Sequence, residues 1–403
     1  MLWESEISRV SRRWRIAAKL EHVDCQLFVQ GRTNKLKLRR QYCNRAVLRS
    51  GEGGISSHLP RVLKPVARQS PTDDPAAFRS ALRSWFTRNG KDYPWRRTSD
   101  PYAVLVSEVM LQQTQIATVL GRGFYSRFLE RFPDVATLAA AEDDVLLKTW
   151  EGLGYYRRAR MLRESAKAVI ERHGGAFPGD LDGLLALPGI GRYTAGAVMS
   201  FAFDRPAPIV DGNVARVLAR QFDRADPIDT TPMQKWLWET ADTLLDRKHP
   251  RTFNSALMEL GQTHCRPGVP DCLSCPVATF CATKEPASLP VKAKKQAIEE
   301  IDEHTALVRR DGKILLSRQG RGRREGMWRL PVREKADLSP LPLLHRRKYG
   351  ITRYRVSLHV HDCPAGHPAA AETEGDEWIS LDRWTELVIP PADRAALTAI
   401  LED

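Results

Sequence analysis

The stretch LPGIGRYTAGAV at residues 187–198, followed by VDGNVARV at residues 210–217, decides the predicted fold. Gly189 and Gly191 lie between two helical segments, and glycine lets a backbone turn tightly and approach another backbone closely. The N–H groups of such a turn can hold a phosphate oxygen where the turn opens a helix. The pattern therefore predicts a helix–hairpin–helix contact to DNA, although an ordinary turn between two helices would show the same glycines.

Asp211 stands 20 residues after Gly191, directly before another helical segment. Aspartate at that place is a typical N-cap, because its side chain accepts hydrogen bonds from the first free N–H groups of the helix. We expect a carboxylate so placed to stay ionised. A fixed anion stabilises the positive charge that develops on deoxyribose when a base leaves. The structural and the catalytic interpretation of Asp211 are compatible.

The rest of residues 73–283 also shows helical periodicity. Phe78, Leu82, Trp85 and Phe86 repeat at the spacing of one helix face. Asp100 and Pro101 form an N-cap and first-turn pair that opens an apolar helix. No segment in this range has the alternation of a strand, so we predict an all-α domain.

Within that apolar helix, SEVMLQQT at residues 107–114 carries a single acidic residue, Glu108. Glu108 and Gln112 are four residues apart and share a helix face. Val106 and Val109 flank the glutamate, and burial among apolar side chains raises the pKa of a carboxyl group. Glu108 is therefore a candidate general acid, whereas the alternative is a helix charge that faces solvent.

Four of the seven cysteines cluster as C-x6-C-x2-C-x5-C within 17 residues. Because the first ten residues lack the apolar core of a secretory signal, this cluster points to metal ligation rather than disulfides. Four thiolates suit a 4Fe–4S cluster, and they could also bind zinc. The candidate ligands are Cys265, Cys272, Cys275 and Cys281.

Taken together, these motifs resemble the helix–hairpin–helix DNA glycosylase superfamily, and the cysteine spacing matches the 4Fe–4S loop of its endonuclease III and MutY branches. The endonuclease III branch has a lysine directly after LPGxGR, which forms a Schiff base with the sugar. Tyr193 occupies that position here and cannot form one. Tyrosine at this position and the segment around Glu108 resemble the MutY branch, the adenine DNA glycosylases, over roughly residues 76–403.

The resemblance implies a mechanism. Adenine opposite 8-oxoguanine or guanine is flipped out of duplex DNA, protonated Glu108 donates to its N7 atom, and ionised Asp211 stabilises the sugar cation. Tyr193 and Asn213 assist. The residues implied to contact DNA are Arg96, Gln112, Gln113, Tyr155, Gly189, Gly191 and Thr352, of which Gln113 and Tyr155 enter the base stack.

Two rival functions remain open at this point. One is an endonuclease III-like glycosylase/lyase that acts on oxidised pyrimidines, against which Tyr193 argues. The other is a non-catalytic iron–sulfur protein that binds mispairs.

Ser255 departs from the family pattern, since many relatives carry Glu or Gln there. The adenine edge must therefore be read through water or through Lys91, Trp95 or Arg96.

A second domain is expected over residues 301–403, after a Pro/Lys-rich linker at 284–300. Here the apolar period changes to two, and Asp311–Gly312 separates two alternating segments as in a β-hairpin. GMWRLP at 326–331 resembles the Nudix-like domain of the MutY branch, which reads 8-oxoguanine. The glutamate run of a Nudix hydrolase is missing, and Ile351–Thr352–Arg353 replaces the usual F-[ST]-H loop, of which only the hydroxyl of Thr352 remains.

The charge and the hydrophobicity of the chain restrict the class of protein. The net charge is +13, but 15 basic and 5 acidic residues lie within residues 1–72, so most of the excess belongs to a basic N-terminal extension that we predict to be flexible. No stretch reaches the ~18 apolar residues of a membrane-spanning helix. We therefore expect a monomeric cytoplasmic protein whose partner is DNA: an all-α glycosylase domain with an iron–sulfur loop, followed by an α+β Nudix-like domain.

Overall fold

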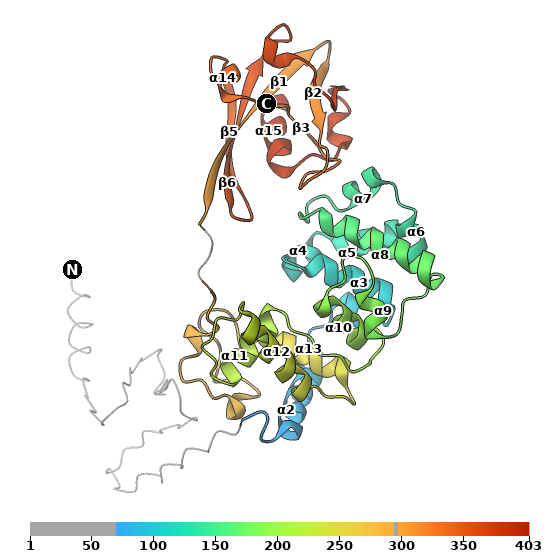
Figure 1. The fold of residues 1–403 in the computed structure, drawn as a ribbon, viewed down its shortest axis with the longest axis vertical. Coiled ribbons are helices and arrows are strands. Elements are labelled where there is room, and N and C mark those ends of the chain that lie inside the picture. The colour runs from blue at the N-terminus through green and yellow to red at the C-terminus, as the bar shows by residue number, and fades with distance from the viewer. Residues whose placement is uncertain (1–69, 294–296, 403) are drawn as a thin grey trace, which may run out of the picture. The chain divides into compact units, whose positions relative to one another are not determined.

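The computed structural model describes residues 70–293 and 297–402 of the chain. The basic extension predicted for residues 1–72 lies almost entirely outside the described residues. Residues 70–293 form helices and turns without a strand, as the sequence predicted (Figure 1). No helix of the described residues is long and apolar enough to cross a membrane.

The helical part begins at α2 (Pro75–Asn89), whose buried face carries Phe78, Leu82 and Trp85 as the periodicity predicted. Short 3-10 turns lie at η1 (Pro94–Arg96), η2 (Ala278–Phe280) and η3 (Pro286–Ser288). The α-helices after α2 are α3 (Pro101–Leu111), α4 (Ile116–Gly121), α5 (Phe124–Arg131), α6 (Val135–Ala139), α7 (Asp143–Thr149), α8 (Arg157–His173), α9 (Leu181–Leu185), α10 (Arg192–Phe201), α11 (Gly212–Gln221), α12 (Thr231–Leu244) and α13 (Pro250–Thr263).

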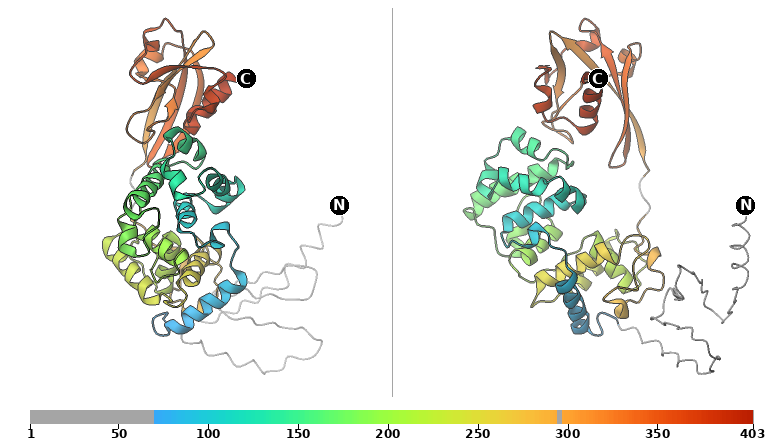
Figure 2. Two further views of the ribbon diagram at one scale, coloured as in Figure 1. Left: turned by 90° about the vertical axis from the view of Figure 1, so that its right-hand side faces the viewer. Right: turned by 180° about the vertical axis from the view of Figure 1, so that it is seen from behind.

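Two hydrophobic clusters hold these helices together. One gathers around α3, α5 and α8, with Val106, Phe128, Trp150 and Leu162 fully or almost fully buried. The other gathers around α2, α11, α12 and α13, and the packing of α2 against α13 is visible in Figure 2. Helix α10 supplies apolar residues to both clusters. The residues at its start are therefore fixed from two sides.

The C-terminal part is a mixed sheet with helices, in the order β3–β2–β1–β6–β5, in which β4 also pairs with β1 and β7 with β2. β1 and β6 are parallel, and the other pairs are antiparallel. The strands are β1 (Glu299–Arg310), β2 (Lys313–Arg318), β3 (Trp328–Arg329), β4 (Val332–Arg333), β5 (Leu343–Ile351), β6 (Tyr354–Cys363) and β7 (Asp376–Ser380), with α14 (Lys335–Leu338), α15 (Pro391–Leu401), η4 (Pro368–Ala370) and η5 (Trp384–Glu386).

The predicted hairpin is confirmed, since Arg310 pairs with Lys313 across Asp311 and Gly312. Both turn residues have positive φ, 49° and 70°, which is the backbone of a two-residue type I′ turn. The segment predicted as a linker over 284–300 is partly structured. Leu289 and Val291 accept hydrogen bonds from the helical part, and β1 already begins at Glu299.

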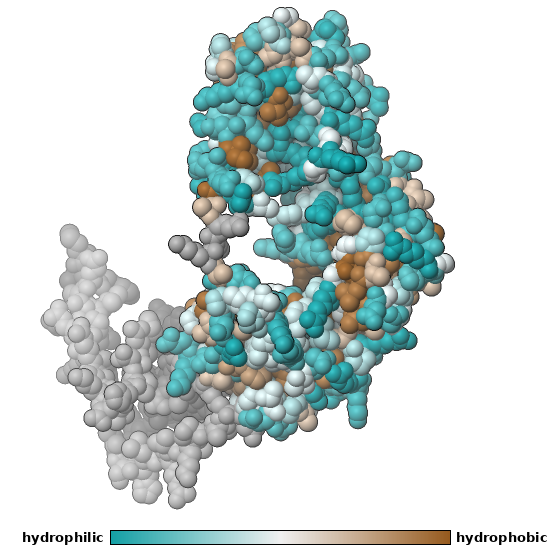
Figure 3. Space-filling view, viewed as in Figure 1, coloured by the Kyte–Doolittle hydropathy of each residue, from teal (hydrophilic) through white to brown (hydrophobic). Residues whose placement is uncertain are grey.

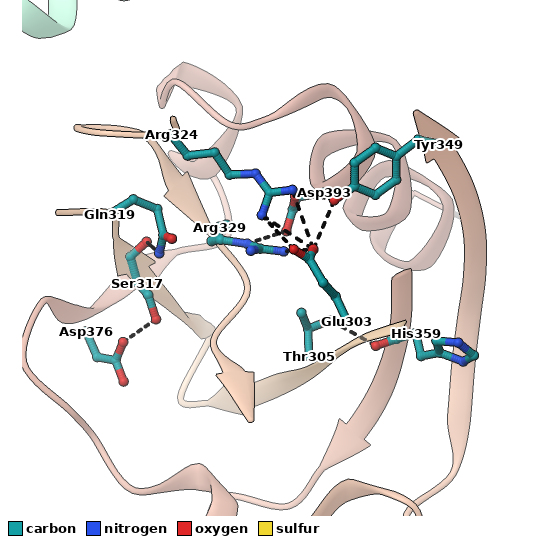
Figure 4. Close-up of polar contacts among 10 residues, drawn as sticks. All are labelled: Glu303, Thr305, Ser317, Gln319, Arg324, Arg329, Tyr349, His359, Asp376 and Asp393. Atoms are coloured by element: carbon teal, nitrogen blue, oxygen red, sulfur yellow. Dashed lines mark hydrogen bonds and ion pairs between the residues drawn. The ribbon is translucent and has the colours of Figure 1, made fainter. Parts of the chain in front are cut away.

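A buried ion-pair network lies inside the C-terminal part (Figure 4). Arg329 is almost completely buried and donates to Glu303 at 2.7 Å and to Asp393 at 3.3 Å. The hydroxyl of Tyr349 donates to the same Glu303 carboxylate at 2.9 Å, and Arg324 pairs with it at 3.2 Å. The network joins β1, β3, β5 and α15, so it connects one face of the sheet to its covering helix. Figure 3 shows that hydrophilic residues predominate on the visible face of the C-terminal part.

Arg329→Met should strongly destabilise the C-terminal part, because it leaves buried Asp393 without its ion-pair partner. The expected loss is about 3–5 kcal/mol. Hydrogen–deuterium exchange of the amides in β1 and α15 measures it in the full chain. Arg355→Met is the matched control: its exposed pair with Glu300 is worth at most about 1 kcal/mol. Equal protection in both variants would contradict the prediction.

Candidate active site

Glu108 lies in the last turns of α3 and is almost completely buried, with 5% of its surface exposed. The alternative of a solvent-facing helix charge is therefore excluded. Its Oε2 atom accepts a hydrogen bond of 2.7 Å from the Tyr193 hydroxyl at the start of α10. The pKa of Glu108 is raised to about 7: burial is the main cause, the hydrogen bond from Tyr193 opposes the rise, and the charge of Asp211 adds to it. Such a carboxyl group holds its proton near neutral pH.

Tyr193 lies beside both acidic groups. Burial raises the pKa of its phenol well above the usual value, and the charges of Glu108 and Asp211 raise it further. The phenol therefore stays protonated and can only donate to the carboxylate. Its hydroxyl also lies 3.9 Å from the sulfur of Met258 on α13.

Asp211 is the N-cap of α11, as predicted. Its Oδ1 atom accepts from the backbone N–H groups of Asn213 at 3.0 Å and Val214 at 2.7 Å, and its Oδ2 atom accepts from the Asn213 amide at 2.8 Å. Arg216 in turn donates to the Asn213 side chain at 2.8 Å, which fixes the orientation of that amide. The carboxylate is thus held by three N–H donors.

These donors do not keep the pKa of Asp211 at its usual value. Burial raises the pKa of this carboxyl group, and the hydrogen bonds from Val214 and Asn213 lower it by less. The sequence suggested an anion held by a helix N-terminus, but it could not show how little solvent reaches the group. Ionisation of Asp211 consequently requires a higher pH than a free aspartate does.

A narrow pocket opens beside Glu108. Its wall includes Trp95 and Arg96, which the sequence suggested near the base, together with Ser255 and Gln262 on α13. Lys91, the third residue suggested there, is not part of the wall: its backbone carbonyl accepts a hydrogen bond from Arg96 instead.

Two features of this wall were not predicted: the ion pair that Arg96 forms and the presence of Gln262. Arg96 forms an ion pair with the buried carboxylate of Glu259, which also accepts from the backbone N–H of Lys91 at 2.9 Å. Gln262 was not a predicted site residue. It follows Ser255 by seven residues, which is two helical turns, so helix periodicity alone could have placed it on the same face.

Of the other candidates, Gln112 lies against α10 with its amide 3.5 Å from the Thr194 hydroxyl. Gln113 is exposed, and so is Tyr155, with 49% of its surface accessible, which excludes a core role for this aromatic ring. Thr352 lies at the turn between β5 and β6, in the C-terminal part, where its hydroxyl donates to the Ile351 carbonyl at 2.7 Å.

The predicted hairpin has the geometry that its glycines suggested. Gly189 has φ +75°, and a Cβ atom there would lie 2.7 Å from the Cβ atom of Met161. Gly191 is the N-cap of α10 and has open space around it. The helix that starts at this hairpin, with its free N–H groups, also carries Tyr193.

The four cysteines of the 265–281 loop are not joined in disulfides. Burial raises the pKa of the Cys275 thiol, and the charges of Cys265, Cys281 and Cys272 raise it further, so the four sulfurs are neighbours. Buried Arg220 donates to the Cys265 sulfur at 3.4 Å, placing a positive charge beside the thiols. Among the described residues, no three His, Cys, Asp or Glu side chains converge on a position for a single metal ion.

The chain is similar to known DNA repair proteins. Residues 106–241 match the model of the HhH-GPD superfamily of base excision DNA repair proteins. The chain is 46% identical over 233 residues to an adenine DNA glycosylase of Mus musculus, covering 55% of this chain and 45% of that protein. It is 38% identical over 205 residues to an adenine DNA glycosylase of Buchnera aphidicola, covering 51% and 57%.

The chain thus spans about half the length of the curated relatives that it matches. Among solved structures, a thermostable thymine-DNA glycosylase shares 32% identity, with a TM-score of 0.49 over 53% of this chain and 98% of the other.

Gly189→Ala should destabilise the helical part by about 1–3 kcal/mol, because alanine at φ +75° is strained and its Cβ atom meets Met161. Urea unfolding followed by tryptophan fluorescence measures the effect. Gly121→Ala has no atom within 4 Å of the new Cβ and should match wild type; wild-type behaviour of Gly189→Ala would refute the prediction.

Proposed function

We propose that the chain is a member of the MutY family of helix–hairpin–helix glycosylases, a monofunctional DNA glycosylase that excises adenine mispaired with 8-oxoguanine or guanine in duplex DNA. The observation that carries this proposal is the hydrogen bond between Tyr193 and Glu108 beside the base pocket. It puts a protonated phenol where a lyase needs an amine nucleophile, and it orients a carboxyl group whose pKa is near 7.

The adenine base enters the pocket after extrusion from the duplex. Protonated Glu108 donates to N7, which makes the base a better leaving group. The walls of the pocket supply the selectivity: Arg96 provides donors, and Gln262 provides the amide that Ser255 lacks, with a donor and an acceptor for the purine edge.

Asp211 acts on the sugar. Its ionised carboxylate stabilises the oxocarbenium-like sugar as the N-glycosidic bond breaks, and Asn213 keeps the carboxylate oriented. Two carboxyl groups in different environments, one neutral and one charged, divide the work as in glycoside hydrolysis. Water then completes the reaction and leaves an abasic site, since Tyr193 cannot form a Schiff base.

The loop of residues 265–281 would hold a 4Fe–4S cluster through Cys265, Cys272, Cys275 and Cys281. Soft thiolates are the usual ligands of such clusters, and the buried guanidinium of Arg220 suits the negative charge of a thiolate-bound group. When bound, the cluster supplies a cross-link that closes the loop.

The C-terminal part reads the opposite base in this proposal. The turn between β5 and β6 presents Thr352, and exposed Arg346, Arg347 and Lys348 on β5 supply positive charge for phosphates. This division of labour makes duplex DNA with the A:8-oxoguanine or A:G mispair the substrate.

Adenine release tests the function directly. Wild type should convert A:8-oxoguanine and A:G duplexes to alkali-labile abasic sites, whereas Glu108→Gln and Asp211→Asn should bind the same duplexes without releasing adenine. Gel separation after alkali measures the rate, and anisotropy measures binding. Covalent trapping of wild type with borohydride, or full activity of either variant, would overturn the assignment in favour of the lyase or another site.

The rate of excision should depend on pH through both carboxyl groups. Glu108 must be protonated, so the rate falls as the pH rises through about 7; Asp211 must be ionised, so the rate also falls at low pH. Tyr193→Phe removes a hydrogen bond that lowers the pKa of Glu108. The alkaline limb should therefore move to higher pH in single-turnover measurements.

Tyr102→Phe is the control for this profile. Tyr102 is also buried and donates a hydrogen bond of 2.7 Å, but to the carbonyl of Phe132 instead of a carboxylate. Its loss should leave the alkaline limb in place. A limb in Tyr193→Phe that stays with that of Tyr102→Phe, or moves to lower pH, would contradict the role given to this hydrogen bond.

A further inference from the structure

Arg158, at the second position of α8, holds the two segments that carry the exposed residues Gln113 and Tyr155. Its guanidinium makes contacts with six acceptors from both segments. Nη1 donates to the carbonyls of Val109 (2.9 Å), Met110 (3.1 Å) and Gln112, and Nη2 donates to the Thr114 hydroxyl (3.3 Å) and to the carbonyls of Leu153 (3.0 Å) and Gly154 (3.2 Å).

The carbonyls on the first segment end α3, the helix of Glu108. The last carbonyls of a helix have no partner inside it, and the negative end of the helix dipole attracts a cation. Arg158 therefore caps α3 from a different helix. Burial lowers the pKa of its guanidinium to about 10, so it remains charged at neutral pH.

The backbone at Gln113 and at Tyr155 explains why such a clamp is needed. Their φ angles are +58° and +48°, a left-handed conformation that non-glycine residues adopt at a cost of about 1–3 kcal/mol. Each directly follows a carbonyl that Arg158 holds, that of Gln112 or of Gly154. The guanidinium also lies 5.5 Å from the centre of the Tyr155 ring.

We propose that Arg158 is a positioning residue, whose single guanidinium sets the separation of Gln113 and Tyr155 so that both enter the base stack around the extruded adenine. The inference rests on the proposed function for the identity of the base. It adds a residue that contacts neither base nor sugar, and acts through the two side chains that do.

A purely structural role would give a different result, and Arg163 provides the comparison. It lies on the same helix, 13% of its side chain is exposed, and it donates to the Ala141 carbonyl at 3.0 Å and to Asp143 at 2.8 Å. Neither partner belongs to the segments of Gln113 and Tyr155. Arg163→Met therefore removes a comparable clamp from α8 without touching them.

The experiment uses the full chain and a duplex with 2-aminopurine at the target position opposite 8-oxoguanine, because 2-aminopurine fluoresces more strongly once it leaves the stack. Arg158→Met should lose most of this fluorescence rise and about 100-fold of the single-turnover rate on adenine. Arg158→Lys keeps the charge but not the fork and should fall between. Arg163→Met should stay near wild type per folded molecule, with folded fractions taken from urea unfolding.

The pH profile separates positioning from chemistry. Arg158→Met should keep the alkaline limb of wild type, since the acid itself is unchanged. Equal losses in Arg158→Met and Arg163→Met, or a full fluorescence rise in Arg158→Met, would overturn the proposal. If wild type extrudes 2-aminopurine but releases no adenine, the proposed function fails, whereas the fluorescence comparison still decides the role of Arg158.

Discussion

A hydrogen bond between two buried side chains, Tyr193 and Glu108, is the contact on which the site depends. A buried carboxyl group is stable only with a partner or a proton, and this one has a phenol that donates to it. The bond joins α3 to α10, and α10 is fixed because both hydrophobic clusters of the helical part pack against it. A shift of either cluster would change the length of the bond, and with it the pKa of the acid.

Free helix ends are used repeatedly around this bond. The start of α11 holds Asp211 by its N–H groups, whereas the end of α3 offers carbonyls that Arg158 satisfies. Both helices are packed in the core, so their ends hold these charged groups in fixed positions. At the start of α10, the N-cap Gly191 has no side chain that could cap the first N–H groups of the helix.

Much of this was accessible from the sequence, because local patterns determine it. The N-caps at Asp100 and Asp211, the Asp311–Gly312 turn and the burial of Glu108 follow from residues within one or two turns. Contacts between distant segments were not accessible. The six acceptors of Arg158 lie 4–49 residues from it in the sequence, and Arg96 and Glu259 are 163 residues apart. A local sequence pattern cannot predict such contacts. The raised pKa of Asp211 was missed for the same reason, since burial is a property of the assembled helices.

The hairpin of β5 and β6 carries Thr352 at its turn. Tyr349, near its end, is held by Glu303 of the buried network, so the turn starts from a fixed base. At the turn, the hydroxyl hydrogen of Thr352 is already used by the Ile351 carbonyl. Its oxygen still has lone pairs to accept a hydrogen bond. 8-Oxoguanine has an N7–H donor where guanine has only an acceptor. Under the proposed function, a threonine hydroxyl that is left as an acceptor would pair with the N7–H of 8-oxoguanine and not with the N7 acceptor of guanine.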